Sequence, residues 1–269
     1  MNEFKYRRKW GPDPKYPCVQ NYIHPHDNFT LIAGPCSVET EMQIHDIAVQ
    51  VAVLDATHLR GGIFRAGTYP PDKFGWVDER LMSAFWFAAQ NNGMQNIVEV
   101  LDYRDLDKID QYASCYQIGA RQMQNYTLLK EVGGAGKPVF LKRNPGAKLD
   151  EWLGSAEYLL QYGCKELYLI ERGSSTHVDH VRWDLSISMI PAVQAITNIP
   201  ILVDGSHGTG RRDLVAPMTL AGVAAGANGC LIETHSDPRN SLSDADQALS
   251  IKEFAYLTQK IINVRGAIK

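Results

Sequence analysis

Apolar, β-branched runs of six to eight residues recur along the chain, and stretches with helical periodicity separate them. The runs alternate too little between apolar and polar positions to have one face in water, which is typical of buried parallel strands. We predict eight strands, at residues 29–34, 57–64, 96–101, 115–120, 138–143, 166–171, 200–205 and 229–234. Helices are expected between them, for example at residues 40–53, 78–92, 149–162, 212–225 and 244–263.

This alternation predicts the α/β fold class, and eight such units in 269 residues favour a closed (β/α)8 TIM barrel over an open doubly wound sheet. Residues 1–28 lie outside the pattern and contain four prolines. We interpret them as a short N-terminal arm, either extended or plugging the barrel, in front of a single barrel domain at residues 29–269.

Composition and charge exclude several classes of function. The net charge of −3 and the pI of about 6.2 give no support for nucleic-acid binding, which favours a basic face. No apolar run reaches the length of a membrane span, and the basic N-terminus lacks the apolar core of a secretory signal. The five cysteines show no paired spacing, so we expect reduced thiols in a cytoplasmic protein.

Cations gather where several predicted strands end, which is the edge that carries the chemistry of such barrels. Each one alone is typical of a solvated loop. Their convergence at one mouth needs an anionic ligand or acidic neighbours, because like charges repel one another. Guanidinium groups fit carboxylate and phosphate, so we predict a ligand that carries both. The cations are Arg60, Arg65, Arg121, Lys142, Arg143 and Arg172.

A second set of side chains lies at or beyond the ends of strands one, seven and eight. A thiol, an imidazole and two carboxylates suit a divalent transition metal such as Mn, Fe, Co or Zn. The spacing matches no zinc-finger pattern, and a buried thiol, a core histidine and surface acids explain the same residues. The metal site and this plainer interpretation both stay open at this point. The four residues are Cys36, His207, Glu233 and Asp244.

The motifs "AGPCSVE", "LRGG.F", "IGAR.MQN", "LKR", "ERG", "VD.SHGTGRRDL" and "IE.H.DP...LSD" occur in order between residues 29 and 249. They resemble the metal-dependent 3-deoxy-D-arabino-heptulosonate 7-phosphate (DAHP) synthases, in the short branch related to 3-deoxy-D-manno-octulosonate 8-phosphate synthase. The resemblance implies a (β/α)8 barrel that condenses phosphoenolpyruvate with erythrose 4-phosphate and releases phosphate, in the shikimate pathway to aromatic amino acids. It also implies a homo-oligomer, either a dimer or a tetramer. The family's feedback control often comes from an appended regulatory module, and from the short arm we expect no such control here.

The resemblance also implies roles for individual residues. The metal ligands would be Cys36, His207, Glu233 and Asp244. Phosphoenolpyruvate would be held by Arg60, Arg121, Lys142 and Arg172, and the substrate site would further include Arg65, Gly119, Ala120, Thr68 and Asp204. Catalytic roles would fall to His207, Lys142, Arg65 and Cys36.

The stretch "RGGIFRAGTYP", residues 60–70, departs from the family, which usually reads R-G-G-A-F-K-P-R-T-S-P. Arg65 replaces the family's lysine, and Gly67 replaces the arginine that holds the acceptor's phosphate. The leading hypothesis is the DAHP synthase reaction. One alternative keeps the chemistry but uses a pentose phosphate or an unphosphorylated aldose as acceptor. A second alternative is a barrel that binds phosphoenolpyruvate without turning it over.

Overall fold

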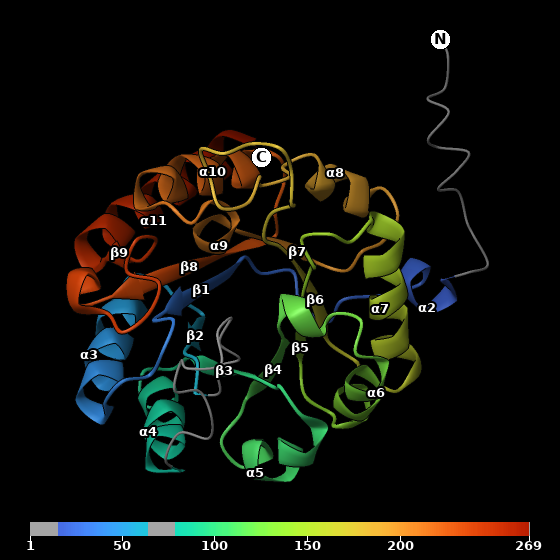
Figure 1. Cartoon of the computed structure of the whole chain (residues 1–269), viewed down its shortest axis with the longest axis horizontal. Coiled ribbons are helices and arrows are strands. Elements are labelled where there is room, and N and C mark those ends of the chain that lie inside the picture. Colours follow the sequence, from blue (N-terminus) through green and yellow to red (C-terminus); the bar gives the residue numbers. More distant parts are fainter. Residues whose placement is uncertain (1–15, 64–78, 269) are drawn as a thin grey trace.

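The computed structural model describes residues 16–63 and 79–268 of the chain (Figure 1). Arg65, Gly67 and Thr68 lie outside the described residues, as does most of the predicted arm.

Within the described ranges, eight parallel strands pair in sequence order, and the last pairs with the first, so the sheet closes into a barrel. This confirms the predicted (β/α)8 fold. A ninth short strand, β9 (Leu249–Ser250), pairs with the end of β8. The barrel strands are β1 (Thr30–Gly34), β2 (His58–Arg60), β3 (Gln95–Glu99), β4 (Cys115–Ile118), β5 (Val139–Lys142), β6 (Leu167–Glu171), β7 (Ile201–Asp204) and β8 (Gly229–His235).

Helices surround the strands as an outer ring (Figure 1). None of those in the described ranges is both long and apolar enough to cross a membrane. They are α2 (Pro17–Gln20), α3 (Glu41–Ala52), α4 (Glu79–Gln90), α5 (Leu106–Asp110), α6 (Tyr126–Gly134), α7 (Leu149–Gln161), α8 (Met189–Gln194), α9 (Gly205–Thr209), α10 (Arg212–Ala224) and α11 (Ile251–Ile268), with 3-10 turns η1 (Tyr103–Asp105), η2 (Ala120–Gln122) and η3 (Pro238–Asn240).

Two predicted boundaries are wrong. The strand expected at 57–64 ends at Arg60, where the chain leaves the barrel wall. The helix expected from residue 244 begins at Ile251, because Asp244 has a φ of 52° and so cannot start a right-handed helix. The segment in front of α11 is instead a loop that folds over the barrel's carboxyl end.

Large apolar side chains fill the interior of the barrel. Phe140 and Tyr168 stack inside it with ring centroids 4.4 Å apart, surrounded by side chains from the other strands. The filled interior leaves the carboxyl ends of the strands as the place for a cavity.

The described part of the predicted arm packs at the opposite, amino-terminal end of the strands. The buried carboxylate of Glu157 accepts hydrogen bonds from the backbone N–H groups of Cys18 and Val19, at 3.1 and 2.9 Å. The Tyr22 hydroxyl accepts one from the backbone N–H of Leu167, which begins β6. Residues 18–22 are therefore anchored away from the end that carries the predicted chemistry, whereas the Tyr16 hydroxyl donates to the carbonyl of Asp150 in the first turn of α7.

A buried histidine in the barrel has a pKa well below its ordinary value. His58 is 9% exposed, packs edge-on against Phe140, and has its Nδ1 2.8 Å from the hydroxyl of Thr57. Burial lowers its pKa to about 4, whereas an unfolded histidine titrates near 6.5.

We therefore expect the unfolded state to bind the proton first as the pH falls below 6.5. The wild-type protein should lose stability relative to a His58→Gln variant between pH 6.5 and 4, by up to about 1.4 kcal/mol per pH unit. Urea unfolding at several pH values measures this difference. A difference that stays constant over that window would contradict the assignment.

Candidate active site

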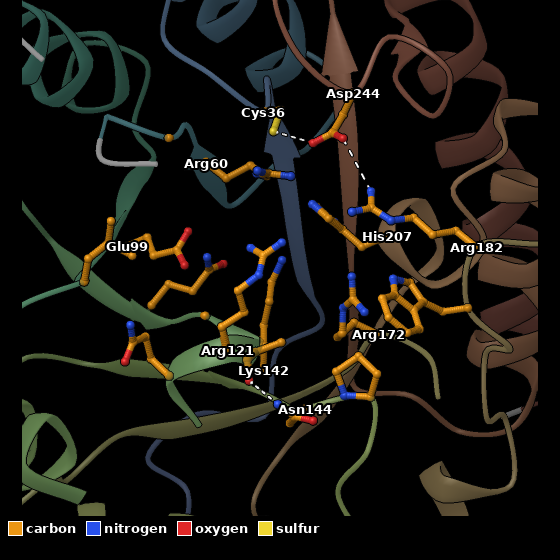
Figure 2. Close-up of a pocket in the computed structure, with 18 of the residues that line it drawn as sticks. Cys36, Arg60, Glu99, Arg121, Lys142, Asn144, Arg172, Arg182, His207 and Asp244 are labelled. Carbon is orange, nitrogen blue, oxygen red and sulfur yellow. Dashed lines mark hydrogen bonds and ion pairs between the residues drawn. The ribbon is translucent and has the colours of Figure 1, made fainter. Parts of the chain in front are cut away.

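A cavity of about 540 Å³ opens at the carboxyl ends of the strands (Figure 2). Strand ends and loops from around the barrel contribute side chains that point into it. The structure brings together there most of the predicted site residues: Cys36, Arg60, Gly119, Ala120, Arg121, Lys142, Arg172, His207 and Asp244. Glu233 and Asp204 lie fully buried directly against this group.

Three of the four predicted metal ligands form a compact group. One ligand atom each from Cys36, Glu233 and Asp244 lies within 4.8 Å of the other two. The Cys36 thiol donates a hydrogen bond to Asp244 at 2.8 Å (Figure 2). The Oε1 atom of Glu233 is buried and has no hydrogen-bond partner among the described residues, which is the state of a carboxylate oxygen left for a cation.

His207 is the fourth predicted ligand, and its ring is held toward this group. It lies in α9, whose N-cap residue Asp204 accepts from the backbone N–H of His207. Asp204 also lies 2.9 Å from Nδ1 of the imidazole, so Nε2 faces Glu233 at 3.8 Å. A carboxylate on the far nitrogen fixes the orientation of many metal-binding histidines. The donor set of sulfur, nitrogen and oxygen therefore fits a divalent transition metal.

The groups around Asp204 keep its carboxyl group ionised. Lys142 Nζ lies 3.1 Å from Asp204 Oδ2, and both groups are almost fully buried. Burial by itself would raise the pKa of the Asp204 carboxyl, but His207 and Lys142 outweigh that effect and hold the pKa below its ordinary value. Burial lowers the pKa of His207, although Asp204 opposes the shift. A neutral imidazole is the form that binds a metal.

The cations form a second group beside the first, and Nη1 of Arg60 lies 3.9 Å from Oε2 of Glu233 where the two groups meet (Figure 2). Arg60 and Arg172 are each 7% exposed, and Lys142 is 5% exposed. Burial lowers the pKa of Arg172 to about 10; Asp204 counteracts this, while Arg182 and Arg121 add to it. Buried cations that repel one another in a cavity are typical of a binding site for an anion with several charges.

Gly119 has a packing role at this edge. A Cβ atom at that position would lie 1.9 Å from Oε1 of Glu99, so only glycine lets this carboxylate lie against the start of η2. Glu99 and Arg121 both point into the cavity (Figure 2).

The prediction that Arg143 joins the cations at the mouth is wrong. Arg143 is 2% exposed and turns away from the cavity to form a paired contact with Glu171, which is fully buried. Its guanidinium also donates to Ser174 Oγ and to the carbonyl of Ala147. Neighbouring residues at a strand end point to opposite faces, so Lys142 faces the cavity and Arg143 cannot.

Sequence analysis missed several cavity residues, and two of them lie far from any strand end. Arg182 and Trp183 belong to the long loop between β6 and α8. Backbone hydrogen bonds between Ser174 and Asp184 turn this loop back over the mouth. The guanidinium of Arg172 lies over the Trp183 ring, 5.2 Å from its centroid. The sequence shows no periodic pattern that predicts a loop folding back over the cavity. Glu99, Gln117 and Asn144 were also missed.

Comparison with known proteins identifies relatives of this chain. The family model described as "DAHP synthetase I family" matches residues 17–269. A phospho-2-dehydro-3-deoxyheptonate aldolase of Thermotoga maritima is 38% identical over 266 residues, covering 94% of this chain and 78% of that protein. A 2-dehydro-3-deoxyphosphooctonate aldolase of Desulfotalea psychrophila is 22% identical over 262 residues, covering 89% and 90%.

Solved structures agree with this result. A truncated form of 3-deoxy-D-arabino-heptulosonate 7-phosphate synthase from Thermotoga maritima has a TM-score of 0.83 at 38% identity and covers 90% of this chain and 88% of that chain. A crystal structure of phospho-2-dehydro-3-deoxyheptonate aldolase from the same organism has a TM-score of 0.86 at 39% identity, covering 90% and 71%.

Proposed function

The chain belongs to the DAHP synthetase I family, and from this premise we propose that it condenses phosphoenolpyruvate with erythrose 4-phosphate to give DAHP and phosphate. The family match over residues 17–269 carries this proposal. The cavity supports it, because the possible metal ligands Cys36, Glu233 and Asp244 lie there next to buried cations. The close relatives favour erythrose 4-phosphate over a pentose phosphate or an unphosphorylated aldose. They also favour an enzyme over a barrel that only binds phosphoenolpyruvate.

We propose that Cys36, His207, Glu233 and Asp244 hold a divalent metal, with Mn, Fe, Co and Zn as candidates. A bound metal ion of this kind supplies Lewis-acid polarisation of the acceptor's aldehyde. The residues themselves keep the site in shape: Asp204 orients the His207 ring, and Gln247 donates a hydrogen bond to Glu233 Oε2. The resemblance gives the ligand roles, and the contacts above support them.

We propose that Arg60, Arg121, Lys142 and Arg172 bind the carboxylate and phosphate of phosphoenolpyruvate. Arg60, Lys142 and Arg172 are buried, whereas Arg121 is exposed. Burial excludes water, which strengthens each charged contact that the buried groups make with the substrate. Lys142 is fixed by Asp204, and Arg172 is fixed against Trp183, so both enter the reaction already oriented. Arg65 and Thr68 stay predictions, since they lie outside the described residues.

The reaction then has two bond-making steps. C3 of phosphoenolpyruvate attacks the aldehyde carbon of the acceptor, and the aldehyde oxygen takes up a proton to become a hydroxyl. Water adds at C2, and phosphate leaves with cleavage of its bond to C2, which becomes the ketone. The cations stabilise the negative charge that gathers on the carboxylate and phosphate oxygens in the closed site.

Loss of one cation should weaken phosphoenolpyruvate binding without unfolding the protein. A charge-assisted contact contributes about 1.5–3 kcal/mol, so Arg172→Ala or Lys142→Ala should raise the Michaelis constant for phosphoenolpyruvate about ten- to a hundredfold. Steady-state kinetics measure this change. Arg104→Ala is the control, because Arg104 is exposed and pairs with Asp102 outside the cavity. Equal Michaelis constants in all three variants would show that Arg172 and Lys142 do not bind phosphoenolpyruvate.

The acceptor is tested by phosphate release from phosphoenolpyruvate with erythrose 4-phosphate, arabinose 5-phosphate and unphosphorylated aldoses. We expect the highest kcat/KM with erythrose 4-phosphate; a higher value for another aldose would identify that sugar as the acceptor, and no phosphate release with any of them would exclude the reaction.

We also propose a cytoplasmic homo-oligomer, a dimer or a tetramer, as the resemblance implies. Light scattering of the purified protein tests the oligomer.

A further inference from the structure

The loop between β6 and α8 delivers one arginine to the cavity that the proposed phosphoenolpyruvate site does not use. The backbone of Arg182 is well anchored: its N–H donates to the carbonyl of Thr209 at 2.9 Å. Its Cβ packs closely against Gly210, because a Cβ atom added to that glycine would lie only 2.7 Å from it. The guanidinium, by contrast, reaches over the cavity from the side opposite Glu99 (Figure 2).

Exposure separates this arginine from Arg60 and Lys142, although Arg121 is exposed as well. The side chain of Arg182 is 44% exposed, whereas those of Arg60 and Lys142 are 9% and 6% exposed. Its Nη1 lies 3.5 Å from Oδ1 of Asp244, which is an ion-pair distance but too long for a strong hydrogen bond. A guanidinium held so loosely keeps most of its N–H donors for a ligand.

The position of Arg182 also indicates which end of the acceptor sugar it would contact. If the buried cations hold phosphoenolpyruvate, the acceptor's aldehyde must lie between that substrate and the group formed by Cys36, Glu233 and Asp244. The rest of a four-carbon sugar then extends outward, past Asp244 and toward the mouth. Arg182 lies beside Asp244, with which it forms an ion pair (Figure 2), and we infer that this pair stands along the path.

We propose that Arg182 binds the phosphate of the acceptor sugar and so determines the preference for a phosphorylated aldose. This inference rests on the proposed function. A planar guanidinium binds two phosphate oxygens at once, and the phosphate would replace the weak contact to Asp244. The net repulsion among Arg182, Arg172 and the other cavity cations falls when both anionic substrates are present.

The experiment compares Arg182→Gln with the wild type on erythrose 4-phosphate and on erythrose. We expect the Michaelis constant for erythrose 4-phosphate to rise at least tenfold. The Michaelis constant for phosphoenolpyruvate, the metal content and kcat/KM for erythrose should stay unchanged, because none of them involves the acceptor's phosphate. Arg182→Lys should give an intermediate value, since a lysine keeps the charge but loses the paired contact.

A second measurement covers the case in which erythrose turns over too slowly to follow. Erythritol 4-phosphate and erythritol both lack the aldehyde, and titration calorimetry with phosphoenolpyruvate present gives their dissociation constants. We expect Arg182→Gln to weaken only the phosphorylated compound. Arg104→Gln is the matched control, because its side chain is 75% exposed and also ion-paired, with Asp102, but lies outside the cavity and away from this loop.

The outcomes separate this inference from the proposed function. An equal loss on erythrose 4-phosphate and erythrose, or a loss of metal, would show that Arg182 acts through Asp244 instead and would overturn the inference. Unchanged kinetics in Arg182→Gln would also overturn it while leaving the reaction intact. A wild-type protein that releases no phosphate from phosphoenolpyruvate with erythrose 4-phosphate would overturn the proposed function itself.

Discussion

Cys36→Ser should lower the rate of DAHP formation more than a hundredfold and remove most of the bound metal. The Cys36 sulfur is one of three ligand atoms within 4.8 Å of one another, and serine offers a poor replacement for a thiolate. Loss of a residue that only supports a metal ligand costs about 10–100-fold, so loss of a direct ligand should cost more. Elemental analysis of the purified variant and a phosphate-release assay measure both effects.

Cys18→Ser is the matched control for this substitution. Cys18 is partly exposed on α2, at the amino-terminal end of the barrel, so its replacement should change neither metal content nor rate. A chelator should likewise abolish the activity of the wild-type protein, and Mn or Co should restore it. Full activity in the chelated protein, or normal metal content in Cys36→Ser, would rule out the proposed site.

The positions of the proposed ligands could be predicted because three of the four lie within or just beyond the carboxyl ends of strands. Cys36 comes two residues after β1, His207 three residues after β7, and Glu233 lies within β8. In a closed parallel barrel all such positions meet at one edge, so strand assignment alone brings them together. Asp244 is different, because it depends on a loop whose left-handed backbone at that residue carries it back to the mouth.

The remaining errors have physical causes of the same kind. Lys142 and Arg143 are neighbours of equal charge, and only the exact register of β5 decides which one faces the cavity. Arg182 and Trp183 reach the cavity through backbone pairing between Ser174 and Asp184, which periodicity does not record. The register of a strand and the path of a loop depend on tertiary contacts. The patterns of apolar and polar residues that predict strands and helices therefore do not reveal them.

The buried pair of Arg143 and Glu171 should contribute strongly to stability. Glu171 is fully buried, and it also accepts a hydrogen bond from the backbone N–H of Gly173 at 2.8 Å. Arg143→Met would leave this carboxylate without its countercharge, which costs about 3–5 kcal/mol. Urea unfolding should show this loss. Arg104→Ala is the control, because Arg104 pairs with Asp102 in an exposed position and should change the free energy of unfolding little.

A double variant distinguishes charge from packing as the cause of that loss. Arg143→Met combined with Glu171→Gln removes both charges, while the amide oxygen still accepts from Gly173, so the double variant should be more stable than Arg143→Met alone. The same pair joins β5 to β6 beside Lys142 and Arg172, so Arg143→Met should also raise the Michaelis constant for phosphoenolpyruvate. A double variant less stable than the single one would show that packing around the guanidinium, and not the buried charge, holds these two strand ends together.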